Sequence, residues 1–525
     1  MHLQSLKIKS FRNLEDIAIT FDEKFTSHAI IGQNGSGKSN LLESIITIFR
    51  DLDLQNPASL SYEMNYLIRG HEIVIKANPG KPPEISIDGE NKSARYLREH
   101  DKEYLPSHIF AYYSGKNERI EKLFQAHQKS FVKELRAGKD DLIRRLFYCR
   151  GGHSQLVLLA CLVYSDPTFT QILKDLNILE LDSALFVIKQ PNYLRKDLSE
   201  KDILEGDPRF WYARGTAVSE FLDKLWQLAV APIDDKLEKQ IDFRGRSEEQ
   251  KQIYLYIKDK EDLQKLADLV GPPETFFRYA EGAYIGDLIE EVRISVKHKN
   301  SDGTMTFDYL SEGELQLLTV LGLMRLTSQD HCLFLLDEPD THLNPIWKLR
   351  YFEEIEKVLQ RNADQTIKGD SQILITTHDP IMVGSLKKEQ VKILKKEKGK
   401  TSIEEPDQDP QGMGVTGLLK SELFGLSSTL DFETQRRLNE RNALFAKGKN
   451  RTKEEDEKLT RLSEELADLG FAQDFRDPMY AKFVQQMALK TKFQKEVLTS
   501  EEIEEQDRIA SEIIDQILAE EKKSL

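Results

Sequence analysis

The stretch Gly32-Gln-Asn-Gly-Ser-Gly-Lys-Ser39 decides the fold of this chain. An apolar run, 29–31, precedes it, and apolar residues recur at helical spacing over 41–49, so residues 29–50 are predicted to form a strand, a loop and a helix. In that context Gly-x4-Gly-Lys-Ser is typical of a phosphate loop, because inward backbone N–H groups and the helix N-terminus attract phosphate oxygens. A glycine turn without a ligand is the alternative.

The loop predicts ATP and Mg²⁺ as cofactors. Lys38 is expected to reach the terminal phosphates as a point charge, and the Ser39 hydroxyl is expected to bind Mg²⁺. The residues expected to contact the nucleotide in this stretch are Gly32, Asn34, Gly35, Ser36, Gly37, Lys38, Ser39 and Asn40.

A second apolar segment, 333–336, ends in two carboxylates, Asp337 and Glu338. A parallel strand that delivers acidic groups to a phosphate site has this form. Asp337 is expected to hold Mg²⁺ through its water shell, and Glu338 is expected to orient and deprotonate the attacking water. Alone, such a strand end is weak evidence for a nucleotide site. It becomes strong evidence when the same chain also has the phosphate loop.

The segment Tyr309-Leu-Ser-Glu-Gly-Glu-Leu-Gln316 is predicted to open a helix that runs to about Leu326. Ser311 as N-cap with Glu314 three residues later also describes an ordinary capping box, and both interpretations can hold together. The segment resembles the signature motif of ABC-type ATPases. That resemblance implies that Ser311, Gly313 and Glu314 bind ATP held by a second copy, so that a homodimer forms around ATP. Glu312 replaces the family's usual second glycine, which disfavours the transporter branch.

Two further segments resemble motifs of these ATPases. Residues 337–344 continue as their D-loop, and Thr376-Thr-His-Asp379 resembles their switch histidine, which implies a catalytic role for His378 rather than a structural one. Arg12 and Asn13 match the N-terminal pattern of RecF and SMC-like heads, in which the arginine lies beside the nucleotide. A surface turn is the alternative for this pair.

The glutamine of the Q-loop is not placed securely. The strand end Tyr112-Tyr-Ser-Gly115 occupies the expected region, and Gln155 is a weaker option.

These motifs predict an α/β fold, an ABC-type (SMC/RecF-like) P-loop NTPase head with a mostly helical insertion and a helical C-terminal region. Residues 1–114 are expected to form the first ATPase lobe and residues 292–404 the second. Residues 115–291 read as the insertion, in which strand-like segments interrupt the helices at 185–188 and 253–257. Residues 405–525 are expected to bind partners or support oligomerisation.

The composition excludes several function classes. The 525 residues carry 74 Lys and Arg against 89 Asp and Glu, a formal net charge of −15, which excludes a protein that coats nucleic acid through bulk positive charge. A local basic groove, and with it a DNA contact, stays open. The three cysteines form no Cys-x-x-Cys pair, which disfavours a thiolate zinc site. No apolar run approaches the ~18 residues of a membrane span, so we expect a cytoplasmic protein with no membrane contact.

The chain as a whole resembles the PtuA-like ATPases of bacterial antiphage defence, known from Septu and retron-associated systems. This resemblance implies a partner nuclease of the HNH type in a larger assembly, and a reverse transcriptase with its RNA/DNA hybrid as a further partner. The segments that carry it are 111–115, 152–156, 336–345, 418–429 and 476–480.

Three other functions compete with a defence ATPase. A RecF or SMC-like ATPase of DNA repair or recombination is the main alternative, although the chain lacks the long heptads of the arm-bearing members. A transporter engine is disfavoured by the long insertion and Glu312. A fused nuclease is disfavoured because the close aspartate pair after the switch histidine, Asp407 and Asp409, lies in a proline-bounded loop.

Overall fold

The computed structural model divides into two compact units, Met1–Met382 with Glu389–Glu404, and Val383–Lys388 with Glu405–Leu525. The second unit resumes at Glu405, the residue at which the C-terminal region is expected to begin. The structure describes residues 1–524 except 116–117, 137–144, 195–197, 199, 241–246, 300–302, 328–330, 361–370, 398–399, 471–477, 494 and 496–497. Two residues of the 476–480 segment therefore lie outside the described residues.

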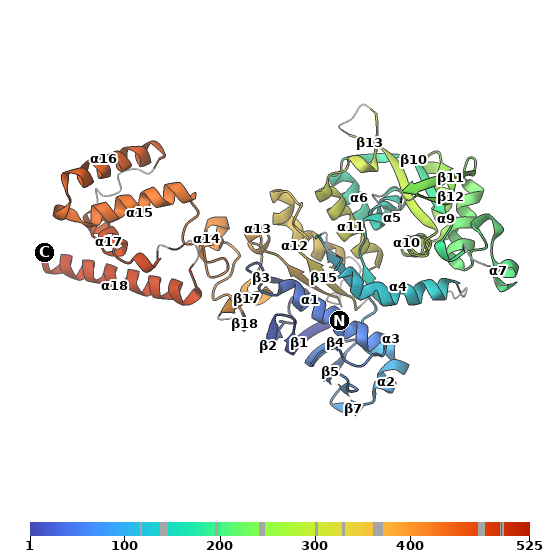
Figure 1. Ribbon diagram of the computed structural model, residues 1–525, viewed down its shortest axis with the longest axis horizontal. Coiled ribbons are helices and arrows are strands. Elements are labelled where there is room, and N and C mark those ends of the chain that lie inside the picture. Colours follow the sequence, from blue (N-terminus) through green and yellow to red (C-terminus); the bar gives the residue numbers. More distant parts are fainter. Residues whose placement is uncertain are drawn as a thin grey trace. The chain divides into compact units, whose positions relative to one another are not determined.

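A seven-stranded sheet forms the centre of the first unit (Figure 1). Every neighbouring pair is parallel except the edge pair β17 and β18. In spatial order its strands are β18 (Lys400–Glu404), β17 (Val391–Glu397), β3 (Ser27–Gly32), β16 (Gln372–Thr376), β15 (Leu333–Asp337), β8 (Ile109–Tyr113) and β9 (Leu146–Tyr148).

The middle strands of this sheet bring the motifs to one edge. All five residues of β15 and all five of β16 are buried, as expected for parallel strands that are covered on both faces. Because β3, β16, β15 and β8 are neighbours in that order, the segments that follow their carboxyl ends lie side by side. These segments are the phosphate loop, the residues around His378, the pair Asp337 and Glu338, and the strand end at Ser114.

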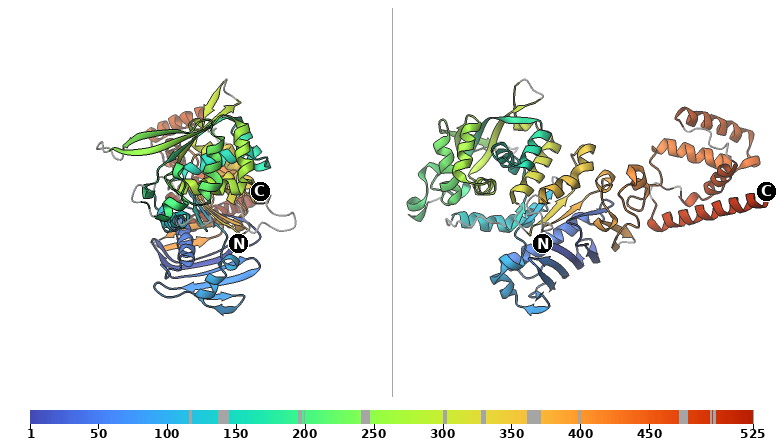
Figure 2. Two further views of the ribbon diagram at one scale, coloured as in Figure 1. Left: turned by 90° about the vertical axis from the view of Figure 1, so that its right-hand side faces the viewer. Right: turned by 180° about the vertical axis from the view of Figure 1, so that it is seen from behind.

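Helix α1 (Lys38–Asp53) lies between this sheet and a six-stranded antiparallel sheet, and its apolar residues share one core with both (Figures 1 and 2). The antiparallel sheet has the order β2 (Leu14–Thr20), β1 (His2–Phe11), β4 (Tyr62–Ile68), β5 (His71–Ala77), β6 (Glu84–Ile87) and β7 (Glu90–Lys92). The short helices α2 (Ala94–Glu99) and α3 (Asp101–Tyr104) lead into β8.

The insertion contains α4 (Glu121–Arg136), α5 (Gly151–Val163), α6 (Pro167–Asp175), α7 (Glu200–Glu205), α8 (Asp223–Leu228), α9 (Lys260–Val270) and α10 (Pro273–Ile285). It also supplies most of a five-stranded antiparallel sheet, with the order β11 (Ile233–Gln240), β12 (Ser247–Ile257), β10 (Ile178–Lys189), β13 (Ile289–His298) and β14 (Thr304–Thr306). The strand-like interruptions at 185–188 and 253–257 are the apolar ends of the longer strands β10 and β12.

The expected boundary between residues 291 and 292 falls inside β13. Strand β13 pairs with β10 along most of its length, so the insertion and the return to the core share one sheet. After it come α11 (Glu312–Thr327), α12 (Pro345–Gln360) and α13 (Pro380–Val383).

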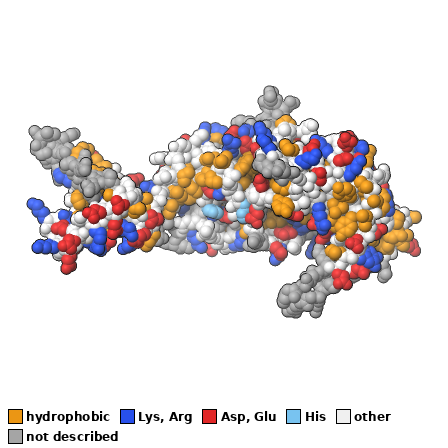
Figure 3. All heavy atoms as spheres, turned by 90° about the horizontal axis from the view of Figure 1, so that it is seen from above, with side chains coloured by type: hydrophobic (Ala, Val, Ile, Leu, Met, Phe, Trp, Pro, Cys, Tyr) orange, Lys and Arg blue, Asp and Glu red, His pale blue; other side chains and the backbone are white. Residues whose placement is uncertain are grey.

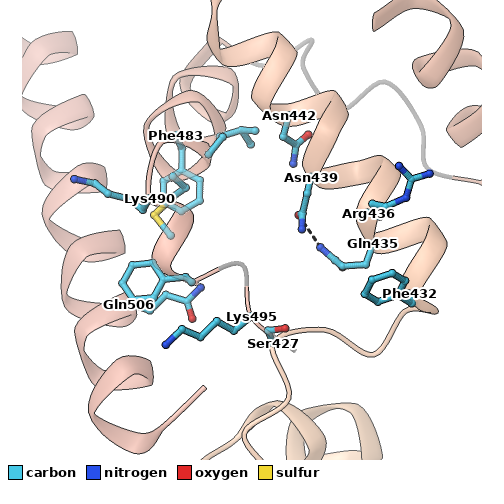
Figure 4. Close-up of a pocket in the computed structure, with 14 residues that line it drawn as sticks. Ser427, Phe432, Gln435, Arg436, Asn439, Asn442, Phe483, Lys490, Lys495 and Gln506 are labelled. Carbon is cyan, nitrogen blue, oxygen red and sulfur yellow. Dashed lines mark hydrogen bonds between the residues drawn. The ribbon is translucent and has the colours of Figure 1, made fainter. Parts of the chain in front are cut away.

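The second unit is helical in its described residues, with α14 (Gly414–Lys420), α15 (Phe432–Ala446), α16 (Lys453–Asp468), α17 (Pro478–Ala488) and α18 (Ser500–Ser524). A cavity of about 470 Å³ lies among these helices (Figure 4). Helix α15 forms one wall of this cavity, where the amide of Gln435 donates to the side-chain oxygen of Asn439 at 2.9 Å. Apolar residues of α17 form the opposite wall.

Within the described residues, no single helix has both the length and the apolar character needed to cross a membrane. Helices α5 and α6 meet the length and composition criteria only as a pair, and that pair is bent by 113°.

Candidate nucleotide-binding site

The loop between β3 and α1 has the close backbone approaches that require glycine. A Cβ atom on Gly32 would clash with the carbonyl oxygen of Leu394 on the neighbouring strand. Gly37 caps α1 in the left-handed region, with φ 115°, and a Cβ there would lie 2.5 Å from a methyl of Leu14. Glycine alone combines this backbone conformation with so little space.

Lys38 folds back over the loop. Its Nζ donates to the carbonyl oxygen of Gly32 at 2.8 Å and to that of Gln33 at 3.4 Å. Burial lowers the pKa of Lys38, while the neighbouring carboxylates of Glu338 and Asp337 oppose that shift. Phosphate oxygens in the loop would offer this ammonium charged acceptors, which form stronger hydrogen bonds than carbonyls.

The remaining loop residues differ in exposure. Asn34 is exposed, whereas the buried Ser36 Oγ has no hydrogen-bond partner among the described residues. A buried hydroxyl without a partner is costly, and a phosphate oxygen would satisfy it. Ser36 therefore suits a phosphate ligand, and the expected contact of Asn34 with the nucleotide stays a prediction.

Asp337 and Ser39 suit a magnesium ion. Asp337 is fully buried, and burial raises its pKa although the hydroxyls of Thr376 and Ser39 oppose the shift. Thr376 donates to Asp337 Oδ1, and Oδ2 has no hydrogen-bond partner in the described part of the chain. A hard cation prefers such oxygens, so the carboxylate of Asp337 and the hydroxyl of Ser39 form a fitting donor set.

Glu338 and His378 face each other across the ends of β15 and β16. The Oε1 atom of Glu338 lies 3.3 Å from Nδ1 of His378, and both side chains are partly exposed. Glu338 adopts a left-handed backbone conformation with φ 49°, and its N–H donates to Thr376 O at 3.1 Å. A non-glycine residue in this conformation costs roughly 1–2 kcal/mol, and such strain clusters at functional sites.

Asn13 and Asn40 contact the loop itself. Asn13 Nδ2 donates to the carbonyl oxygen of Gly35 at 3.0 Å, and Asn40 donates in turn to Asn13 Oδ1. In the structure these two side chains therefore hold the loop backbone, and their expected contact with the nucleotide stays a prediction.

Arg12 contacts a charged cluster, Glu43 with Arg119, that the sequence motifs did not include. It pairs with Glu43 of α1 at 2.6 Å, and Arg119 pairs with the other oxygen of the same carboxylate. Glu43 is fully buried, and burial raises its pKa although both arginines oppose the shift. The sequence signal for this cluster is that Glu43 places a carboxylate among the apolar residues of the predicted helix, 41–49.

Tyr113 is a further neighbour of the site. It ends β8 in register with Asp337 of β15. Its pKa is raised by burial and then by Asp337. The chain after it stays close to β15, because the N–H of Ser114 donates to Asp337 O at 3.3 Å.

Gln155 does not take part in this site. Its Oε1 accepts from the N–H of Val292 at 2.9 Å and thereby joins α5 to β13. We therefore discard Gln155 as a Q-loop residue. The end of β8 remains the equivalent region, although it contains no glutamine.

The signature residues form a capping box at the start of α11. Ser311 Oγ donates to Glu314 Oε2 at 2.7 Å, and the Glu314 N–H donates to Ser311 Oγ at 3.3 Å. Gly313 lies against the carbonyl of His342, whose ring pairs with Glu312 at 3.0 Å. These contacts join the signature to the segment after β15, so within the described chain the structure brings it to the D-loop and not to the phosphate loop.

A parallel sheet with a glycine-rich loop after β3 and two carboxylates after β15 defines a P-loop NTPase head of the ABC type. The chain belongs to the RecF/RecN/SMC N terminal domain family, whose model matches residues 2–402.

Individual proteins are also similar to parts of this chain. The DNA replication and repair protein RecF of Oceanobacillus iheyensis is 26% identical over 205 residues, 38% of this chain and 46% of that protein. The DNA double-strand break repair Rad50 ATPase of Archaeoglobus fulgidus is 26% identical over 122 residues, 21% of this chain and 13% of that protein. The matched stretch thus spans less than half of either relative. The SMC head domain from Thermotoga maritima aligns with 77% of this chain and 99% of its own, at 13% identity and a TM-score of 0.32.

Proposed function

We propose that this chain binds ATP with Mg²⁺ and hydrolyses it. The observation that carries the proposal is the buried carboxylate of Asp337: its Oδ2 has no hydrogen-bond partner among the described residues, and the group interacts with the hydroxyl of Ser39 and the ammonium of Lys38. Such an arrangement is costly unless a cation and phosphates complete it.

Each residue has a definite role in this reaction. Lys38 binds the terminal phosphates, while Ser39 and Asp337 would hold the metal, which neutralises phosphate charge when bound. Glu338 orients a water molecule and accepts its proton at a carboxylate oxygen. The ring of His378 stands 3.3 Å from Glu338 and fixes the direction of that carboxylate.

The signature residues indicate that two copies share the nucleotide. Tyr309, the first residue of the signature segment, is 76% exposed, and Ser311 is also exposed. The capping box engages the N–H of Glu314, whereas the first N–H groups of any α-helix have no acceptor within the helix and attract phosphate. We infer that Ser311, Gly313 and Glu314 act on ATP bound by the phosphate loop of the other copy, so that ATP closes a homodimer.

The cellular role that we favour is DNA repair or recombination, because the curated relatives are named as DNA repair proteins. On the face drawn in Figure 3, basic side chains alternate with acidic ones. DNA contact would therefore use a local site. We also propose a cytoplasmic location with no membrane contact. A role in repair or recombination predicts that the chain binds DNA when ATP is present.

A second candidate is a defence ATPase that scaffolds an HNH nuclease, with a reverse transcriptase and its RNA/DNA hybrid as further members of a larger assembly. The supporting observation is the second unit, most of which lies beyond the family match that ends at residue 402. If the chain expressed with its neighbouring genes copurifies with such a nuclease, the defence role is favoured. If it binds DNA alone with ATP, the repair role is favoured.

The experiment that tests ATP hydrolysis compares Lys38→Ala with Lys24→Ala. Lys24 is exposed and precedes β3, at the end of the strand opposite the loop. We expect Lys38→Ala to lose ATP binding and phosphate release, because the phosphate charge is left unneutralised, while Lys24→Ala behaves as wild type. Normal nucleotide affinity in Lys38→Ala would refute the site.

A further inference from the structure

Glu43 joins the phosphate loop to the start of the insertion. It follows Ser39 by four residues, so both side chains lie on one face of α1. Its carboxylate is fully buried and pairs with Arg12 on one oxygen and with Arg119 on the other. Arg119 precedes α4 by two residues. A shift of its guanidinium would therefore move the N-terminus of that helix.

A second ion pair continues from α4 to α5. Glu121, in the first turn of α4, pairs with Arg150 at 2.8 Å, and Arg150 also donates to Gln128 on the same helix at 2.7 Å. The backbone N–H of Arg150 donates to the ring of His153, so this arginine is the N-cap of α5. Two contacts from one arginine thus fix the start of α5 to α4.

Helix α5 in turn packs tightly on the signature helix α11. Gly322 of α11 lies so close to α5 that a Cβ there would clash with Val157, which is fully buried. Tightly packed helices move together, because interiors packed to this density transmit displacement. The N-terminus of α11 carries Ser311.

We propose that Arg119 is a positioning residue that relays the nucleotide state of the phosphate loop to the signature helix of the same subunit, through its ion pair with Glu43 and through helices α4 and α5. This inference rests on the proposed binding of ATP. It gives the insertion a regulatory role, because the signature takes its binding position for the partner's nucleotide only when its own loop is occupied.

The driving force is competition for the guanidinium. Without nucleotide, Glu43 is the anion that pairs with Arg119, and Arg12 pairs with the other carboxylate oxygen. ATP is an anion that would bind beside the first turn of α1, and its charge attracts the guanidinium of Arg119 through space, without direct contact. Arg119 shifts toward that anion, and the start of α4 follows.

The test is hydrogen–deuterium exchange of the full chain, with and without ATP and Mg²⁺. Four variants are compared with wild type: Arg119→Gln, Arg119→Lys, Glu43→Gln and, as a matched control, Arg95→Gln, whose arginine is exposed and pairs with Glu99 on the same helix, α2. Nucleotide affinity is measured in parallel. The exchange rate of peptides from α5 measures whether the change at the phosphate loop reaches that helix.

We expect ATP to change exchange in α5 of the wild type and of Arg95→Gln, and we expect Arg119→Gln to lose that change while it still binds ATP. Arg119→Lys should restore part of it. Glu43→Gln, which releases Arg119, should show the ATP-like exchange of α5 without nucleotide. If wild type fails to bind ATP, the proposed function fails. If ATP binds but α5 responds equally in wild type and Arg119→Gln, or if Glu43→Gln and Arg119→Gln change α5 alike, the relay is refuted.

Discussion

At the scale of single residues, several carboxylates at or near the site are buried. Asp337, Asp340 and Glu43 are almost fully buried, and burial raises the pKa of each. Buried charges reduce stability unless a partner compensates them. The nucleotide-free protein therefore holds unfavourable negative charge, which a metal and the neighbouring cations would offset.

This charge predicts a gain in stability for Asp337→Asn. Because the folded pKa of Asp337 lies above the unfolded value, the folded state binds the proton more tightly, and the ionised carboxylate destabilises the fold at neutral pH. The amide keeps an acceptor for Thr376. We expect the variant to lose ATP hydrolysis and to gain up to about 2 kcal/mol at pH 7 without Mg²⁺.

The difference in stability should shrink as the pH falls, since the wild-type carboxyl then takes up its proton. Calorimetric unfolding at pH 7 and at lower pH measures it, with the exposed Asp308→Asn as control. A loss of stability at pH 7, or a difference that widens on acidification, would show that the buried charge is already compensated.

The sequence predicts the residues of this site that belong to local motifs. The loop 32–39 and the pair Asp337 and Glu338 can be read from short, contiguous patterns with a strand on one side. The pairing of Glu43 with Arg12 and Arg119 cannot, because it joins three segments that are distant in sequence. Their meeting depends on the order of strands in the sheets, which no local pattern encodes.

At the scale of secondary structure elements, the close contact between α5 and α11 joins the insertion to the signature helix. Valine in a helix has essentially one χ1 rotamer, so Val157 cannot easily move away from an added methyl at Gly322. We expect Gly322→Ala to destabilise the protein by about 1–3 kcal/mol, because overpacking exceeds the roughly 1 kcal/mol gained from helix propensity.

Thermal unfolding measures this loss of stability. The double variant Gly322→Ala with Val157→Ala should recover much of the stability that Gly322→Ala loses, because the smaller side chain at 157 makes room for the added methyl. Gly151→Ala in α5 is the matched control, since a Cβ there meets no atom within 4 Å. If Gly322→Ala were as stable as Gly151→Ala, α5 and α11 would not be in the close contact on which the relay depends.

The insertion shows where element prediction from sequence fails. Its helices follow from apolar periodicity, but the outer part of β12 is polar, and the outer part of β10 mixes apolar residues with acidic ones and is partly exposed. Only the apolar ends of the two strands, 185–188 and 253–257, carry a strand pattern. The long pairing of β10 with β13 depends on residues far apart in sequence, so no local pattern shows that residues 291 and 292 lie within one strand.

At the scale of the whole molecule, the two compact units suggest separate roles. The nucleotide site lies in the first unit, and the last helix of the second unit has apolar residues on two sides. Ile513 and Ile517 are buried, whereas Ile514 and Leu518 are 46% and 42% exposed. The exposed pair, four residues apart, lies on one helix face and can contact a partner.

We therefore expect the double variant Ile514→Asp with Leu518→Asp to retain ATP hydrolysis and to lose partner capture or higher assembly. Deletion of 500–525 should do the same, but it also removes the packing of α18, so the point variants are the cleaner probe. Copurification and ATPase assays measure the two effects. Equal loss of hydrolysis and of capture would place α18 in the catalytic mechanism.

The central claim is that ATP closes two copies through the signature of each, and sedimentation velocity of Glu338→Gln with ATP and Mg²⁺ tests it most directly. Glutamine keeps the binding contacts but cannot accept the proton of water, so we predict a stable dimer that forms only with ATP. Adding Ser311→Arg should abolish that dimer, because it places bulk and charge at the opposing phosphate. A Glu338→Gln chain that binds ATP yet stays monomeric would contradict the claim.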